Sequence, residues 1–343
     1  SNTQRKPNPF TGFDKQDNMP MHALTPNKPL HIVNMTLNLV KGENLAWQQR
    51  KAAPFTSTRL HTGSCRIGYR TSKEYGGHKG AITLGTAITV SGAAASPNMG
   101  YNSSPLLTIV MMLFNARLGW WLGNPRHKET WRNSGPTFGV RPFIDEMFGL
   151  TDDKNPWIYL SDGGHFENLG LYEAVLRRCS YIVVSDASCD PDFAYDDLGN
   201  AVRKIKIDLG ISIDFTALSG GKGMPMSPTQ KPTPDHNGRH CAIAFIRYSA
   251  IDGPGAPDGL LVYLKPSLSG DEPTDVRQYA AANHTFPHQT TADQFFEEAQ
   301  FESYRRLGFH IIESICGSER KPRTLKEFAA DAQRYAEHDC RTS

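Results

Sequence analysis

The stretch Trp157-Ile158-Tyr159-Leu160-Ser161-Asp162-Gly163-Gly164 decides the fold that the sequence predicts. Its first four residues form a short apolar run, which is typical of a buried strand. The run leads directly into an Asp-Gly-Gly sequence, where the glycines indicate a sharp turn. A helical pattern over 169–178 and a continuous apolar run over 181–184 follow it. We therefore expect a strand, a tight turn, a helix and then a parallel strand that is buried on both faces.

The alternation of strand and helix patterns continues downstream. Residues 196–205 favour a helix, and residues 211–215 return to a strand pattern. Such β-α-β-α-β alternation predicts an α/β fold in which a mostly parallel central sheet is flanked by helices. Ligands collect at the carboxyl ends of the strands in such sheets, so Asp162 stands where a site is expected.

Other segments have weaker patterns, which predict their structure one by one. We expect a strand over 30–40, a small-residue element over 81–96, a helix over 106–122, a short helix over 142–149, a loop over 219–239, a hairpin of 241–248 with 260–264, and a long amphipathic helix that Thr291 caps.

Composition excludes several classes of function. The 343 residues include 37 basic and 35 acidic side chains, so the chain has no global field that would recruit nucleic acid. The six cysteines show no CxxC or Cys/His spacing, which indicates neither a zinc site nor a disulfide framework and favours a reducing compartment. The N-terminal residues lack the apolar region of a signal peptide, and the apolar run 106–114 is too short to span a bilayer.

Asp162 is the strongest candidate for chemistry. A carboxylate at the end of a buried strand, held on a turn that requires glycine, projects into the space beyond the sheet. There it can accept a proton from a serine hydroxyl and return it to a leaving group, as a general base does. The alternative is structural, because Asp-Gly by itself is an ordinary turn signal.

The context of this turn resembles a known family. Residues 161–169, which read Ser-Asp-Gly-Gly-His-Phe-Glu-Asn-Leu, resemble the aspartate motif of patatin-like phospholipases, with Asn168 standing where the family has an asparagine. The strand 182–188 is similar to the corresponding strand of cytosolic phospholipases and fungal lysophospholipases, and the small-residue block 91–96 is similar to a helix start in patatins. The resemblance implies a patatin-like three-layer sandwich, incomplete at its N-terminal side.

The same resemblance implies the organisation and the site. It divides the chain into a polar lead-in over 1–28, the C-terminal portion of an acyl hydrolase domain over 29–318, and a polar tail over 319–343. The site residues that it implies are the catalytic Asp162 and the turn residues Gly163, Gly164 and Asn168. The implied activity is hydrolysis of lipid acyl esters, of the phospholipase or lysophospholipase type, by a Ser-Asp dyad that requires no metal or organic cofactor.

The chain departs from the family in one respect, because it contains no Gly-x-Ser-x-Gly nucleophile motif. In the family this motif and a glycine-rich oxyanion loop precede the strand matched here by 30–40. We therefore expect an upstream segment to supply the serine and expect these 343 residues to be inactive alone. The alternative is a non-catalytic patatin-like module that binds lipid or mediates assembly.

The remaining polar residues have structural interpretations. His165 is expected to satisfy its own turn, Ser91 lacks the preceding glycine of a nucleophile elbow, and Asp186 is expected to fix the Asp162 loop or to pair with Arg178. The expected partners are a lipid or phospholipid substrate and the periphery of a membrane, with no nucleic acid. The expected location is the cytoplasm or the cytoplasmic face of a membrane.

Overall fold

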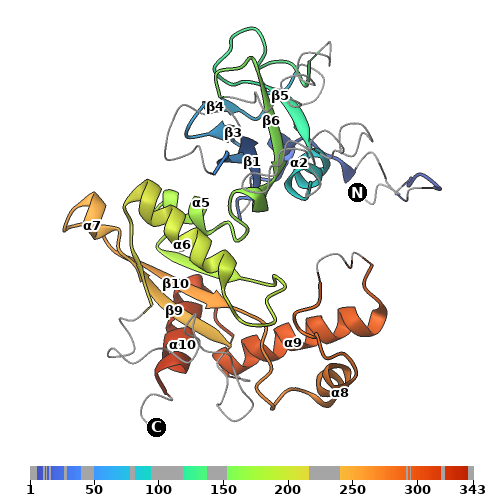
Figure 1. Cartoon of the computed structure of the whole chain (residues 1–343), viewed down its shortest axis with the longest axis vertical. Coiled ribbons are helices and arrows are strands. Elements are labelled where there is room, and N and C mark those ends of the chain that lie inside the picture. Colours follow the sequence, from blue (N-terminus) through green and yellow to red (C-terminus); the bar gives the residue numbers. More distant parts are fainter. Residues whose placement is uncertain are drawn as a thin grey trace. The chain divides into compact units, whose positions relative to one another are not determined.

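The chain divides into two compact units, which are residues 1–168 and 169–343 (Figure 1). The computed structural model describes residues 6–10, 12, 14, 17–26, 29–39, 50–77, 82–93, 119–136, 153–215, 240–290, 293, 295–317 and 321–338. Each unit has its own sheet.

The first unit is built on a six-stranded antiparallel sheet with the order β4-β3-β2-β1-β6-β5. Its strands are β1 (Ile32–Asn38), β2 (Ala52–Thr58), β3 (His61–Ser64), β4 (Gly68–Thr71), β5 (Trp120–Gly123) and β6 (Trp157–Asp162). Its helical elements are η2 (Met21–Ala23), α2 (Leu84–Ser91) and η4 (Gly163–His165). The helix α2 packs against β1 and β6.

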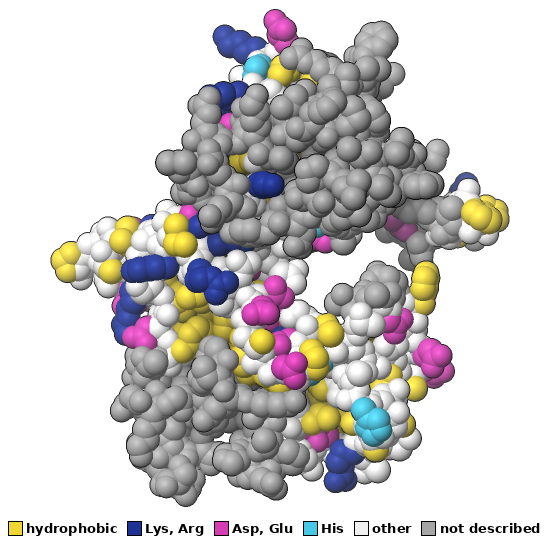
Figure 2. All heavy atoms as spheres, in the orientation of Figure 1, with side chains coloured by type: hydrophobic (Ala, Val, Ile, Leu, Met, Phe, Trp, Pro, Cys, Tyr) yellow, Lys and Arg dark blue, Asp and Glu magenta, His cyan; other side chains and the backbone are white. Residues whose placement is uncertain are grey.

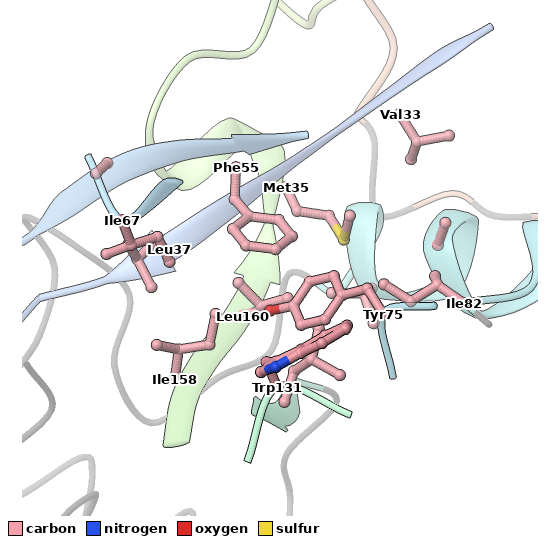
Figure 3. Packing of buried hydrophobic residues seen from close by; sticks show 14 of the residues in the cluster. Val33, Met35, Leu37, Phe55, Ile67, Tyr75, Ile82, Trp131, Ile158 and Leu160 are labelled. Atoms are coloured by element: carbon pink, nitrogen blue, oxygen red, sulfur yellow. The ribbon is translucent and has the colours of Figure 1, made fainter. Parts of the chain in front are cut away.

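Strand β1 lies inside this sheet because its side chains alternate in character. Val33, Met35 and Leu37 join the buried apolar cluster, where they meet Phe55 and Leu160 (Figure 3). Successive side chains of a strand point to opposite faces, so the intervening residues, Asn34, Thr36 and Asn38, lie on the other face. The polar face of β1 is defined here by these three residues.

The second unit contains a four-stranded mixed sheet with the order β7-β10-β9-β8. Its strands are β7 (Tyr181–Ser185), β8 (Ile213–Asp214), β9 (Cys241–Ile246) and β10 (Gly259–Leu264). Strand β10 pairs with β7 in parallel and with β9 antiparallel, while β8 is antiparallel to β9. Its helices are α5 (Leu171–Leu176), α6 (Asp196–Leu209), α7 (Ser249–Asp252), α8 (Thr274–Ala282), α9 (Glu298–Cys316) and α10 (Leu325–His338).

The core of the second unit forms where α9 and α10 bury their apolar sides. Leu307, Ile311 and Ile315 of α9 recur at helical spacing and cluster with Ile243 and Val262 of the sheet. Three alanines of α10, Ala329, Ala332 and Ala336, complete the same cluster. Residues 325–338, within the segment described above as a polar tail, are thus an ordered helix with a buried face.

The predicted α/β class, with a mostly parallel central sheet flanked by helices, is wrong. The apolar run 157–160 belongs to β6, which is antiparallel to both β1 and β5. The next run belongs to β7, which lies in the other sheet, and β7 with β10 is the sole parallel pair among the described strands. Periodicity identifies a strand, but it specifies neither the partner strand nor its direction.

Several local predictions agree with the structure, whereas others differ or fall outside the described residues. The strand over 30–40, the helix near 196–205 and the hairpin of β9 with β10 are present. Residues 120–122, which were expected to end a helix, belong to the strand β5. Four further predictions lie outside the described residues: the helix over 106–118, the helix over 142–149, the loop over 219–239 and the cap Thr291.

The surface and the helix lengths give two further facts. Basic and acidic side chains both lie on the face of the molecule shown in Figure 2, in keeping with their near balance in the sequence. Within the described ranges, every helix falls short of the length or the apolar character that a bilayer crossing requires.

Candidate active site

Asp162 ends β6 and begins the turn that follows it. Its Cα pairs with that of Met35 on β1, and its side chain caps the short helix η4. The Gly164 backbone N–H donates to Asp162 Oδ1 over 2.7 Å, which is the usual geometry of a capping aspartate. This is the only hydrogen bond that the Asp162 carboxylate makes with the described residues, and the side chain is half-buried.

Gly163 is required by a close approach of two backbones. A Cβ atom at this position would lie 2.8 Å from the backbone oxygen of Asn34, which belongs to β1. Such a contact leaves no room for any side chain, so glycine alone fits. At Gly164 a Cβ would lie 2.9 Å from Asn168 Oδ1, which places the exposed Asn168 side chain over the turn. The structure therefore brings the four predicted site residues together.

The turn is fastened to the polar face of β1. The Thr36 hydroxyl donates to the Gly163 carbonyl over 3.2 Å and accepts the Phe166 N–H over 3.0 Å. The same carbonyl accepts the N–H groups of Phe166 and Glu167 over 3.1 and 3.0 Å. Since Thr36 is fully buried, water does not compete for these bonds, and the strand fixes the position of the turn.

Ser161 and His165 form a second pair behind the aspartate. Ser161 Oγ lies 2.9 Å from His165 Nδ1 and accepts a hydrogen bond from Asn38 Nδ2 over 2.8 Å. This is the separation of a nucleophile and its base. However, the Ser161 side chain is 0% exposed, so no substrate carbonyl reaches its oxygen. The pair therefore braces the turn, which agrees with the structural interpretation of His165.

Sequence reasoning missed the contribution of β1 to this site. The polar face of β1 contacts the site through three residues. Asn34 and Thr36 contact Gly163 of the turn, and Asn38 contacts Ser161 near the end of β6. The available signal was their alternation with apolar residues, which marks a polar strand face. Which element that face would contact could not be read from the sequence, because β1 and the turn are separated by more than a hundred residues.

A second aspartate, Asp186, follows β7 and has an environment unlike that of Asp162. Tyr263 donates its hydroxyl proton to Asp186 Oδ2 over 2.5 Å, and Lys265 Nζ donates to the same oxygen over 3.2 Å. Ser188 donates to Oδ1 from its hydroxyl and its backbone N–H over 2.6 and 2.9 Å. Lys265 also pairs with Asp190 over 3.4 Å. Asp186 and Lys265 thus face each other at the carboxyl ends of the parallel strands β7 and β10.

The surroundings of Asp186 stabilise its charged form. Burial raises the pKa of this carboxyl, but the hydrogen bonds from Ser188 and Tyr263 and the charge of Lys265 outweigh burial, so the net pKa lies below its ordinary value. Both oxygens are occupied by donors, and the side chain is almost fully buried. The expected pairing of Asp186 with Arg178 is absent, because Arg178 pairs instead with Asp252 over 2.6 Å.

One group of side chains in the described residues has the composition of a metal site. The ligand atoms of His240, Asp271 and His310 all lie within 4.8 Å of one another. These residues are far apart in the sequence and follow no local spacing motif, so no metal site is expected there from the sequence. They belong to the second unit, whereas Asp162 belongs to the first.

Comparisons with known proteins identify no family. No protein-family model matches the chain, and no curated protein sequence matches it. Among solved structures it is similar to human GIVD cytosolic phospholipase A2, with 14% identity and a TM-score of 0.47 over 90% of this chain and 45% of that chain. The chain therefore spans less than half the length of that structure, and the likeness is a distant one.

Proposed function

We propose that the Asp162 turn is the general-base half of a serine–aspartate hydrolase that acts on lipid acyl esters. The serine would come from a segment outside residues 1–343, because these contain no Gly-x-Ser-x-Gly motif. The observation that carries the proposal is the hydrogen bonding of the Asp162 carboxylate. It is held by one backbone N–H through Oδ1, while no described residue donates to Oδ2.

This arrangement suits proton transfer. A general base must keep one oxygen available within hydrogen-bond reach of the proton that it removes. Asp162 keeps Oδ2 for this purpose, and the bond from Gly164 fixes the orientation of the carboxylate. The buried hydroxyl of Thr36 and the backbone contact at Gly163 hold the turn against β1, so the carboxylate is positioned before substrate binds.

The reaction follows from these positions. As the serine oxygen attacks the acyl carbon, its proton passes to Asp162, which then returns it to the departing alcohol. An acyl-serine ester remains, and water hydrolyses it with Asp162 acting again as the base. The backbone donors that stabilise the oxyanion would come from the same outside segment as the serine.

The substrate class comes from the resemblance of residues 161–169 to the patatin-like aspartate motif. We propose a lipid or phospholipid ester presented at a membrane periphery on the cytoplasmic side. The rival function is a lipid-binding or assembly module without catalysis, and the missing serine motif is the observation that favours it.

The test compares Asp162→Asn with Asp252→Asn in the natural protein that contains these residues. Asp252 is a matched control because it forms a surface pair with Arg178 in the other unit. We expect Asp162→Asn to lower kcat for a short-chain lipid ester by about 10²–10⁴-fold, the contribution of general-base catalysis. We expect Asp252→Asn to hydrolyse it at the wild-type rate.

Two outcomes would count against an enzyme. Equal rates for wild type and Asp162→Asn would show that Asp162 only shapes a turn. If the wild-type protein neither hydrolyses esters nor reacts with a fluorophosphonate, yet still binds phospholipid vesicles, the module is correct. Thermal melting of both variants shows whether a lost rate reflects lost folding.

A further inference from the structure

Three metal-binding side chains converge in the second unit from separate elements. His240 immediately precedes β9, Asp271 lies between β10 and α8, and His310 lies in α9. Their ligand atoms all fall within 4.8 Å of one another. The tertiary fold therefore gathers two imidazoles and a carboxylate at one point.

The distances match those of ligands around a small ion. His310 Nε2 lies 3.1 Å from Asp271 Oδ1. Two ligands that each stand about 2.0–2.2 Å from a tetrahedral zinc are separated by roughly 3.4 Å. The two side chains thus need to move apart by only a few tenths of an ångström. Asp271 has this freedom, since its side chain is 68% exposed.

The surrounding residues hold the ligands in place. Ser269 Oγ donates to Asp271 Oδ1 over 2.7 Å and lies 3.2 Å from His240 Nε2. The buried Glu272 accepts the backbone N–H groups of Ser269 and Gly270, which fixes the loop that carries Asp271. Ser267 Oγ lies 3.4 Å from His240 Nδ1, the ring nitrogen on the other side. Such outer contacts orient imidazole ligands in metal proteins.

We propose that His240, Asp271 and His310 bind a divalent transition metal ion, for which Zn²⁺ is the best match. Two imidazoles exclude Mg²⁺ and Ca²⁺ as preferred ions, because both take oxygen ligands. The three ligands leave a fourth tetrahedral position for water on the exposed side of Asp271. The ion ties α9 and the loop before α8 to the start of β9, so it stabilises the second unit.

The test is a titration of the metal-free protein with Zn²⁺, followed by calorimetry. We expect the wild type to bind about one equivalent, and we expect His310→Ala and Asp271→Asn to lose about 100-fold or more in affinity. The matched control is His284→Ala, because His284 is exposed and lies outside the cluster. Zn²⁺ should raise the Tm of the wild type and of this control, but not that of the other two variants.

A Co²⁺ spectrum distinguishes this site from binding by the free cysteines. Nitrogen and oxygen ligands give tetrahedral d–d bands without the thiolate charge-transfer band that sulfur produces. Equal Zn²⁺ binding by wild type, His310→Ala and Asp271→Asn would overturn the proposal, and so would a thiolate spectrum that both variants retain. Because Asp271 is largely exposed, Asp271→Asn keeps the test decisive even if His310→Ala fails to fold.

Discussion

Asp162 and Asp186 both stand at the carboxyl end of a strand and both follow a serine, yet their surroundings differ. The first sequence reads Leu160-Ser161-Asp162, and the second reads Val184-Ser185-Asp186. Asp162 is half-buried, with one bond from Gly164. Asp186 is almost fully buried, and Ser188, Tyr263 and Lys265 occupy both of its oxygens. The same local pattern thus produces one carboxylate with an oxygen to which no described residue donates and another whose two oxygens both accept hydrogen bonds.

The difference arises from the partner strands. Asp162 ends a strand in an antiparallel sheet, where its lateral neighbour on β1 is Met35. Asp186 follows β7, which runs parallel to β10, so Lys265, the residue that follows β10, lies at the same edge of the sheet. Parallel pairing places the carboxyl ends of both strands at the same edge of the sheet. Antiparallel pairing places the carboxyl end of one strand beside the amino end of the other. A functional interpretation of a strand-terminal aspartate therefore depends on the direction of its neighbours.

The largest expected effect is on the Asp186 side of this comparison. Lys265→Met removes a fully buried cation and leaves Asp186 and Asp190 without their counter-charge. Breaking a buried pair in this way costs about 3–5 kcal/mol in the free energy of unfolding. Urea unfolding followed by circular dichroism measures the loss, with Lys321→Met at an exposed position as the control. A loss no greater than that of the control would contradict a structural role for the pair.

On the Asp162 side, the largest effect should come from the turn backbone. Gly163→Ala places a methyl group 2.8 Å from the Asn34 backbone oxygen, and the resulting shift should cost about 1–3 kcal/mol. Gly308→Ala is the matched control, because its Cβ meets nothing within 4 Å and it lies in α9. That change should stabilise the protein by about 0.5–1 kcal/mol. A loss of stability in Gly163→Ala together with a gain in Gly308→Ala would confirm the close approach of Gly163 to β1. A gain in both variants would contradict it.

A pH change should affect the surroundings of Asp186 through His288. Burial lowers the pKa of His288, and the charge of Lys265 lowers it further. The carboxylates of Asp190 and Asp186 raise the same pKa, but by less, so the net pKa is lowered. The unfolded chain therefore binds the proton more readily, and stability falls as the pH drops below the unfolded value of about 6.5. We expect a smaller free energy of unfolding at about pH 5.5 than at about pH 7.5.

The variant His288→Phe isolates this effect. Phenylalanine keeps the ring that packs edge-on against Phe193, 4.6 Å away between centroids, and it cannot titrate. The difference in unfolding free energy between the two pH values should shrink in this variant. An unchanged pH dependence would assign the effect to other groups.

The smallest expected effect is that of Asp162→Asn on stability. Asparagine caps a helix about as well as aspartate, so the change should cost no more than about 0.5 kcal/mol. Thermal melting measures it beside the rate assay described above. A large loss of stability would mean that the Asp162 charge holds the fold, which would remove the contrast with Asp186.

Local sequence patterns predicted individual elements of this fold better than their assembly. The strand over 30–40, the Asp-Gly-Gly turn and the β9–β10 hairpin follow from alternation and glycine placement, which act within a few residues. The sheet type failed because β6 and β7 share an apolar pattern but belong to different sheets. A continuous apolar run favours a parallel strand, which is correct for β7 but wrong for β6.

The candidate site shows the same limit. Asp162, Gly163, Gly164 and Asn168 are near one another in sequence, so a single motif predicted that they would lie together. Thr36 arrives from a strand far upstream, and His240, Asp271 and His310 meet only after the second unit has folded. Contacts of this kind depend on tertiary packing and carry no local signal.

The division into two units determines what intrinsic fluorescence can detect. All five tryptophans fall within residues 1–168, at positions 47, 120, 121, 131 and 157, and Trp131 is part of the core of that unit. The second unit contributes tyrosine but no tryptophan. Emission excited selectively at tryptophan therefore reports the melting of the Asp162 turn and its sheet.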